Sequence, residues 1–159
     1  TAIGRYPVET VATMAKIALR AEEHINYEQM LLSRSHWANA TVSDAISYAT
    51  CHLASTLKAQ AIITSTETGR TAKQISRYRP KSAIVATTPN EATVRQLMLW
   101  WGVKPLKTPV SENIDQMLQT AIEVTKQANL VKPDAKIVIT AGALVNVPGT
   151  TNLIKVETA

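Results

Sequence analysis

Residues 64–71 are the part of this sequence whose residue types and spacing best suit the binding of a phosphate group. They follow the short apolar run 61–63 and consist of Thr64, Ser65, Thr66, Glu67, Thr68, Gly69, Arg70 and Thr71. A buried strand that leads through a hydroxyl-rich turn into a helix offers an anion the unpaired N–H groups and the positive dipole end of that helix. Gly69 permits a sharp turn, and Arg70 supplies a fixed positive charge. These residues therefore predict a phosphate-binding loop.

The same residue types are compatible with a simpler role. Serine and threonine are common N-caps of helices, so a capped helix without a ligand would have a similar sequence. The segment lacks the Gly-x-x-x-x-Gly-Lys-Ser/Thr spacing of a nucleotide-binding P-loop. Phosphate binding and simple capping both remain open, and a P-loop is excluded.

Alternating strands and helices must position this loop. Apolar runs predict strands over residues 61–64, 83–87, 103–107, 136–141 and 152–157. Helical spacing predicts helices over 7–25, 41–57 and about 71–78, and further helices that begin at the caps Asn90 and Ser111. For the helix 41–57, the expected buried stripe is Val42, Ala45, Ile46, Ala49, Leu53 and Leu57.

This alternation predicts an α/β fold in which a mostly parallel sheet is covered on both faces. Parallel strands need long crossover connections, and the link 142–151 is too short for a helical one. The last strand is therefore expected to run antiparallel. We predict a three-layer α/β/α sandwich with about five strands. A chain of 159 residues, of which 45% are hydrophobic, can form one such domain with its own core.

The charge of the chain favours a small anionic partner over nucleic acid. The 17 basic residues exceed the 12 acidic ones, and the densest basic run spans residues 70–81. Only 4% of residues are aromatic, whereas surfaces that bind single-stranded nucleic acid need exposed rings for stacking. For Lys73 and Arg77, a solvated helix face is the simpler interpretation. We expect no nucleic-acid partner, and no membrane partner because no apolar run has the length of a membrane span.

Cysteine and histidine give no sign of catalysis or metal binding. Cys51 is the single cysteine and cannot form an internal disulfide, which fits the expected cytoplasmic location. His24, His36 and His52 do not have the spacing of a zinc site. We therefore expect no metal ligand and no catalytic residue in this chain.

Four segments in the same order resemble the C-terminal domain of pyruvate kinase. Residues 1–9 are similar to the start of the last helix of the family's catalytic barrel. Residues 65–71, followed by residues 78–80, resemble its effector-phosphate loop and the end of the next helix. Residues 137–142 and 149–156 resemble its closing strands. The resemblance covers nearly the whole chain.

This resemblance implies the allosteric and assembly domain of a glycolytic enzyme that transfers phosphate from phosphoenolpyruvate to ADP. Residues 1–25 would be the last barrel helix, 26–40 a linker, and 41–159 the C-terminal domain. The metal ligand and the phosphoenolpyruvate contacts of the family lie on the barrel, upstream of residue 1. We therefore expect this chain to be inactive alone and to hold no cofactor, with magnesium and potassium acting in the full-length enzyme.

Ligands of open α/β sheets bind beyond the carboxyl ends of the parallel strands, and residues 142–151 follow the predicted strand 136–141. Gly142, Asn146, Gly149 and Thr150 would belong to a loop that folds over a sugar phosphate, although a plain flexible connection fits their types equally well. Glu67 stands where relatives that bind a sugar bisphosphate can have lysine, and a carboxylate repels phosphate. The expected effector is therefore a sugar monophosphate or AMP. The strand 152–157 is expected to pair with a second copy and form a homo-oligomer.

Two other classes of function remain open from the sequence. A stand-alone α/β enzyme or a binding protein for a small phosphorylated metabolite could use the same scaffold, with Glu67 as the one candidate base near the loop. A nucleic-acid-binding module is suggested only by the positive charge. Its binding would fall steeply with salt, which distinguishes it from the other two classes.

Overall fold

The computed structural model of the chain describes residues 3–35, 41–143 and 149–159. Its helices are α1 (Pro7–Glu22), α2 (Tyr27–Ser33), α3 (Val42–Leu57), α4 (Arg70–Tyr78), α5 (Glu91–Leu97) and α6 (Ile114–Gln127). Its strands are β1 (Ala61–Ser65), β2 (Ala83–Thr88), β3 (Val103–Lys107), β4 (Lys136–Gly142) and β5 (Thr151–Thr158).

The five strands form one sheet in the order β3-β2-β1-β4-β5. The pairs β3–β2, β2–β1 and β1–β4 are parallel, and β4–β5 is antiparallel with a register irregularity between Ala141 and Gly142. All five residues of the central strand β1 are buried, as expected for a parallel strand covered on both faces. The predicted five-stranded, mostly parallel sheet with an antiparallel last strand is confirmed.

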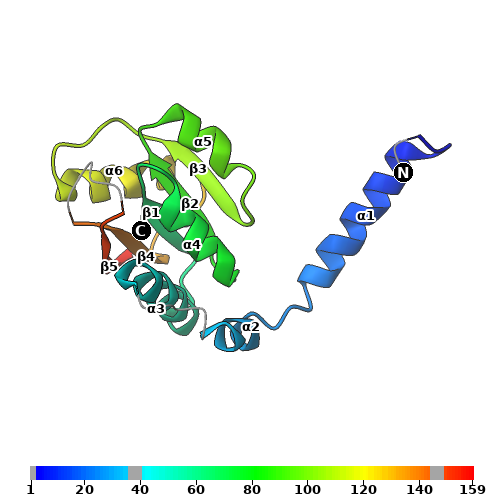
Figure 1. Cartoon of the computed structure of the whole chain (residues 1–159), viewed down its shortest axis with the longest axis horizontal. Coiled ribbons are helices and arrows are strands. Elements are labelled where there is room, and N and C mark those ends of the chain that lie inside the picture. Colours follow the sequence, from blue (N-terminus) through cyan, green and yellow to red (C-terminus); the bar gives the residue numbers. More distant parts are fainter. Residues whose placement is uncertain (1–2, 36–40, 144–148) are drawn as a thin grey trace.

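Helices cover both faces of this sheet (Figure 1). Alternate residues of each strand point to opposite faces, so neighbouring residues belong to different cores. On one face, Ile62 of β1 lies in a core with residues of α3, α4 and α5, which are Cys51, Ala54, Ala72, Ile75, Tyr78 and Leu97. On the other face, Ile63 lies in a core with Leu118 and Ala121 of α6. The predicted three-layer α/β/α arrangement is confirmed.

Helix α1 extends away from the sheet and its covering helices (Figure 1). It has no buried residue, and its large apolar side chains are exposed at Val8, Val11, Met14, Ile17 and Leu19. No helix in the described parts of the chain is long and apolar enough to cross a membrane.

Helix α2 lies within the segment 26–40 that was predicted to be a linker. The side chain of Asn26 caps it by accepting a hydrogen bond from the N–H of Gln29 at 3.0 Å. Its residue Leu31 is buried in the core beneath α3 and α4. The polar composition of the segment gave no sign of this helix. One cap and one buried leucine are nevertheless enough to hold two helical turns against a core.

The helix starts confirm one predicted cap and correct another. Asn90 caps α5 by accepting hydrogen bonds from the N–H groups of Ala92 and Thr93. The expected cap at Ser111 was wrong, since Asn113 accepts the hydrogen bond from the first turn of α6. Ser111 is instead buried before the helix begins.

Candidate functional site

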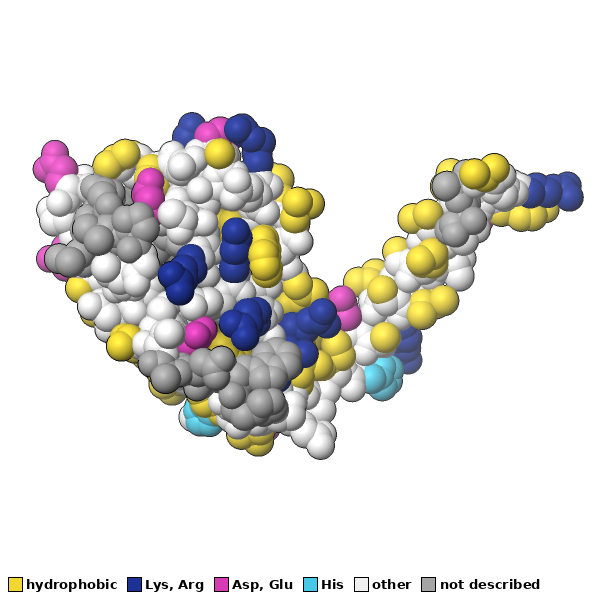
Figure 2. Space-filling model, in the orientation of Figure 1, with side chains coloured by type: hydrophobic (Ala, Val, Ile, Leu, Met, Phe, Trp, Pro, Cys, Tyr) yellow, Lys and Arg dark blue, Asp and Glu magenta, His cyan; other side chains and the backbone are white. Residues whose placement is uncertain are grey.

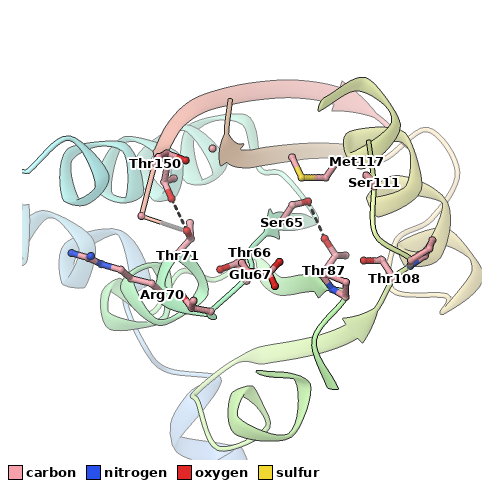
Figure 3. Close-up of a pocket in the computed structure, with 16 residues that line it drawn as sticks. Ser65, Thr66, Glu67, Arg70, Thr71, Thr87, Thr108, Ser111, Met117 and Thr150 are labelled. Atoms are coloured by element: carbon pink, nitrogen blue, oxygen red, sulfur yellow. Dashed lines mark hydrogen bonds between the residues drawn. The ribbon is translucent and has the colours of Figure 1, made fainter. Parts of the chain in front are cut away.

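A pocket lies where four connections leave the carboxyl ends of the parallel strands (Figure 3). Residues from β1 and β2 and from the connections after β1, β2, β3 and β4 line it, and it is open to solvent. Ligands of open α/β sheets bind at this end of the strands, because the loops there converge. The topology of the sheet thus brings together residues as far apart in the chain as Thr71 and Thr151, which are separated by 80 positions.

Six of the eight residues predicted in the first loop line this pocket: Ser65, Thr66, Glu67, Thr68, Arg70 and Thr71. Gly69 belongs to the loop but is buried, and its nearest neighbours are side chains of α5. Thr64 does not line the pocket either. It is fully buried, and its hydroxyl has no hydrogen-bond partner within the described residues. Because strand residues alternate between faces, Thr64 and Ser65 cannot both point toward the same pocket.

The second predicted loop also reaches this pocket. Gly142, Gly149 and Thr150 line it, whereas Asn146 lies outside the residues that the structure describes. At the end of β4, the N–H of Ala143 donates to the side chain of Asn152 at 2.9 Å. This bond holds the two ends of the connection together at the mouth of the pocket.

The loop after β1 is fixed by hydrogen bonds to its neighbours. The N–H of Thr66 donates to the carbonyl of Thr87 on β2 at 2.9 Å. The N–H of Gly69 donates to the Thr66 hydroxyl at 3.0 Å, which closes the turn. The hydroxyl of Thr93 on α5 donates to the carbonyl of Glu67 at 3.0 Å. The loop is therefore held at both ends and in its middle before any ligand binds.

Gly69 has a conformation and a packing environment that only glycine fits. Its φ is +77°, in the left-handed region, and it forms the N-cap of α4. A Cβ at this position would lie 2.9 Å from Cδ2 of Leu97, whose side chain is fully buried. The loop therefore packs directly on α5, and this contact sets the start of α4 at the pocket.

Two hydroxyl pairs join the walls of the pocket (Figure 3). The hydroxyls of Ser65 and Thr87 are 3.0 Å apart and connect β1 to β2. Those of Thr71 and Thr151 are 2.6 Å apart and connect the first turn of α4 to the start of β5. The pocket surface is consequently rich in hydroxyl groups whose positions are set by the sheet and by α4.

The side chains that line the pocket include few charges. Among the described lining residues, Arg70 is the one cation and Glu67 is the one carboxylate. Arg70 is exposed and Glu67 is half-buried. Helix α4 begins at this point, and its N-terminus adds a partial positive charge and unpaired N–H groups. Such a surface can hold a single phosphate group but offers little charge for a second one.

The loop after β3 contributes residues that the sequence interpretation did not include. Thr108 and Ser111 of this loop line the pocket opposite the loop after β1, together with Met117 of α6. The rule that ligands bind at the carboxyl ends of parallel strands applies to β3 as well. Thr108 could therefore have been predicted as a pocket residue. Ser111 was assigned to helix capping instead, which concealed its place at the pocket.

The residues that line the pocket do not by themselves suit a magnesium ion. Magnesium in proteins is usually held by one or two carboxylates together with substrate phosphates, and Glu67 is the single carboxylate that lines the pocket in the described structure. Within residues 3–35, 41–143 and 149–159, no group of three histidine, cysteine or acidic side chains could hold a metal ion.

Comparison with known proteins gives a consistent result. Residues 44–157 match the family described as "Pyruvate kinase, alpha/beta domain". The chain is 43% identical over 157 residues to a pyruvate kinase of Clostridium acetobutylicum, covering 99% of the chain and 33% of that protein. It is 42% identical over 157 residues to a pyruvate kinase of Geobacillus stearothermophilus, covering 99% of the chain and 27% of that protein.

A third relative is pyruvate kinase 2 of Synechocystis, which is 46% identical over 158 residues, or 99% of the chain and 26% of that protein. The chain thus spans about a quarter to a third of the length of these curated relatives. The family match covers the sheet up to residue 157 and all the residues that line the pocket. The chain belongs to the pyruvate kinase family and corresponds to its C-terminal α/β domain.

Proposed function

We propose that the pocket binds the phosphate of a sugar monophosphate or of AMP, and that this ligand regulates a pyruvate kinase of which the chain forms the C-terminal domain. The observation that carries the proposal is the convergence of hydroxyl side chains on the N-terminus of α4, with Arg70 beside it. Hydrogen bonds to a charged phosphate contribute about 1.5–3 kcal/mol each, so a few of them support binding.

The charge of the pocket favours one phosphate over two. Arg70 and the N-terminus of α4 can offset the charge of a single phosphate. A second phosphate in the same pocket would meet the Glu67 carboxylate. The hydroxyl groups of Thr87 on β2, and of Thr108 and Ser111 in the loop after β3, suit the hydroxyls of a sugar. A sugar monophosphate therefore fits better than fructose 1,6-bisphosphate.

The same composition supports a regulatory role over a catalytic one. Phosphoryl transfer needs bound metal and several cations around the transferred group to stabilise its spreading charge. The described pocket lining offers one cation and one carboxylate, Arg70 and Glu67. In this proposal, catalysis in the longer enzyme takes place outside the chain, and the pocket binds an effector.

We also propose that β5 joins two copies of the domain. Strand β5 lies at one edge of the sheet and β3 at the other. Strand β3 carries Pro105 between Lys104 and Lys107, features that block pairing with a further strand. Strand β5 has no proline over residues 151–158, and its Val156 is 44% exposed. Edge-to-edge pairing is therefore expected at β5.

Calorimetry tests the proposed ligand site. Ribose 5-phosphate, AMP and fructose 1,6-bisphosphate are titrated into the wild-type chain and into Thr68→Glu, which adds a carboxylate beside Glu67. Thr13→Glu on α1 adds the same charge far from the pocket and is the matched control. The monophosphates should bind the wild type and Thr13→Glu, and should give no heat with Thr68→Glu. Equal binding to all three proteins would place the ligand elsewhere and leave the loop as a helix cap.

Proline substitution tests the proposed assembly. In an antiparallel ladder, the N–H groups of consecutive residues point alternately to the two neighbouring strands. Of Lys155→Pro and Val156→Pro, one therefore removes an N–H that points away from β4. Sedimentation should show a dimer for the wild type, and a monomer that remains folded for that one variant. A wild-type monomer at high concentration, or dimers for both folded variants, would contradict pairing through β5.

A further inference from the structure

The net positive charge of the chain is concentrated in one continuous part of the sequence. Residues 68–111 hold one acidic residue, Glu91, and eight basic ones: Arg70, Lys73, Arg77, Arg79, Lys81, Arg95, Lys104 and Lys107. Glu91 pairs with Lys107 at 3.0 Å and with Arg95 at 3.5 Å, so it does not offset the remaining cations. The half of the domain formed by α4, β2, α5 and β3 is thus positive, although the whole chain has a net charge of only +5.

An exposed apolar turn lies within this positive part of the domain. It follows α5 and contains Met98, Leu99 and Trp100, whose exposed fractions are 66%, 91% and 39%. Leu99 has the highest exposed fraction of any large apolar side chain described between residues 4 and 159. Single exposed leucines are common on protein surfaces, but three consecutive exposed apolar residues that include a tryptophan form a patch.

Cations of α4 lie directly beside this turn. The Lys73 ammonium is 5.4 Å from the ring centre of Trp100, and the Arg79 guanidinium is 5.4 Å from the ring centre of Trp101. The hydroxyl of Ser76, also on α4, donates to the carbonyl of Trp101 at 2.7 Å and holds the turn against the helix. Figure 2 shows dark blue and yellow side chains next to one another over α4. Apolar anchors and positive charge therefore share one surface.

We propose that this surface, made of the turn 98–101 with Lys73 and Arg79, binds an acidic protein segment that carries a large apolar side chain. Tryptophan, methionine and arginine are among the residues enriched at protein interfaces, and tryptophan and arginine are frequent binding hot spots. The apolar side chain of the partner packs on Leu99 and Met98. Its carboxylates pair with Lys73 and Arg79, whose positions are already set by the tryptophan rings.

The details of this surface favour a protein over nucleic acid, a membrane or a second copy of the chain. Stacking of bases needs open ring faces, whereas cations already lie over Trp100 and Trp101. Membrane insertion needs a wider apolar face than one short turn provides. A second copy would bring the same positive charge against this surface. Lys73, Arg79 and residues 98–101 are not among the residues that line the pocket, so the proposal does not depend on the proposed effector.

Selection from a phage-displayed library of random 12-residue peptides tests the proposal with the whole chain as bait. Peptides enriched on the wild type should have a net negative charge and at least one aromatic or large aliphatic residue. Leu99→Ser, and separately Lys73→Glu with Arg79→Glu, should weaken the binding of a selected peptide about tenfold or more in fluorescence polarisation. The matched controls are Val110→Ser, another exposed apolar residue, and Lys126→Glu on α6, and both should bind like the wild type.

Unchanged urea unfolding midpoints will show that the variants remain folded, which is expected because the altered side chains lie at the surface. The proposal is overturned if the selected peptides show no excess of acidic residues, or if they bind both surface variants as tightly as the wild type. It is also overturned if a 12-nucleotide oligothymidylate or phosphatidylglycerol vesicles bind the wild type more tightly than the peptides and lose that binding in Leu99→Ser.

Discussion

Replacing Gly69 by alanine tests whether packing on α5 fixes the start of α4 at the pocket. Gly69 has φ +77° and caps α4, so the substitution acts on the backbone of the loop itself. The new Cβ would lie 2.9 Å from Cδ2 and 3.2 Å from Cγ of Leu97, and 3.3 Å from Cγ2 of Thr93. Leu97 is fully buried and Thr93 is nearly so, which leaves them little room to move.

Two contributions set the size of the expected effect. A residue with a side chain in the left-handed region costs about 1–2 kcal/mol relative to glycine. Overpacking of a well-packed core typically costs about 1–3 kcal/mol more. Gly102 separates the two, because its φ is +67° while a Cβ there would come no closer than 4.0 Å to Ile84. Gly102→Ala should therefore lose about 1–2 kcal/mol of unfolding free energy, and Gly69→Ala about 2–5 kcal/mol.

Urea denaturation of the wild type and both variants measures these losses, provided that the slopes of the three transitions agree. Gly69→Ala should also weaken binding of ribose 5-phosphate, because a shift of the loop moves the N–H groups at the start of α4. Gly102→Ala should leave that binding unchanged. Equal losses of stability in the two variants would show that contact with Leu97 does not hold the loop, and would refute the reasoning.

Three further outcomes are expected. Glu67→Lys should tighten binding of fructose 1,6-bisphosphate about tenfold or more in calorimetry, since one new charge-assisted bond contributes about 1.5–3 kcal/mol; no change would mean that Glu67 does not face the ligand. Burial raises the pKa of the Cys51 thiol, so the unfolded chain loses this proton first as pH rises. Unfolding free energy should thus fall above about pH 8.5, and Cys51→Ala should reduce that fall; identical profiles would argue against it. The purified chain should form no ATP from phosphoenolpyruvate and ADP with magnesium and potassium, and turnover that survives removal of host enzymes would contradict this.

The arrangement of the loops could be derived from the sequence because it depends on topology. Apolar runs separated by helical segments fix a parallel sheet, and the short link after β4 fixes the direction of β5. Once the strands are parallel, their carboxyl ends must all lie at the same end of the sheet. That the loop after β1 and Gly149 meet in one pocket can therefore be predicted without knowledge of side-chain packing.

Details that depend on a choice between equivalent residues could not be derived in this way. Ser111 and Asn113 are both good N-caps two residues apart, and their types do not decide between them. In the structure Asn113 caps α6, while Ser111 is buried at the pocket. Thr64 and Ser65 are likewise similar in type, and only the phase of β1 decides that Ser65 faces the pocket.

Helix α3 shows a different limit, because its hydrophobic pattern indicates the wrong face. The apolar stripe expected to be buried includes Val42, which is 66% exposed. The face that packs on the sheet and on α4 instead carries Ser43, Ser47, Thr50, Cys51 and Ala54.

Small side chains on that face suit a helix that packs closely on its neighbours, and burial of its hydroxyls is compensated by hydrogen bonds. Those of Ser47 and Thr50 donate to carbonyls one turn earlier in α3, at 2.7 Å each. That of Ser43 donates to the side chain of Gln74 on α4 at 2.6 Å. A buried hydroxyl that is hydrogen-bonded loses little free energy, so the face of small residues can be the buried one. Hydrophobic periodicity cannot predict that this face is the buried one. It ranks residues by apolarity and not by how closely they allow two elements to approach.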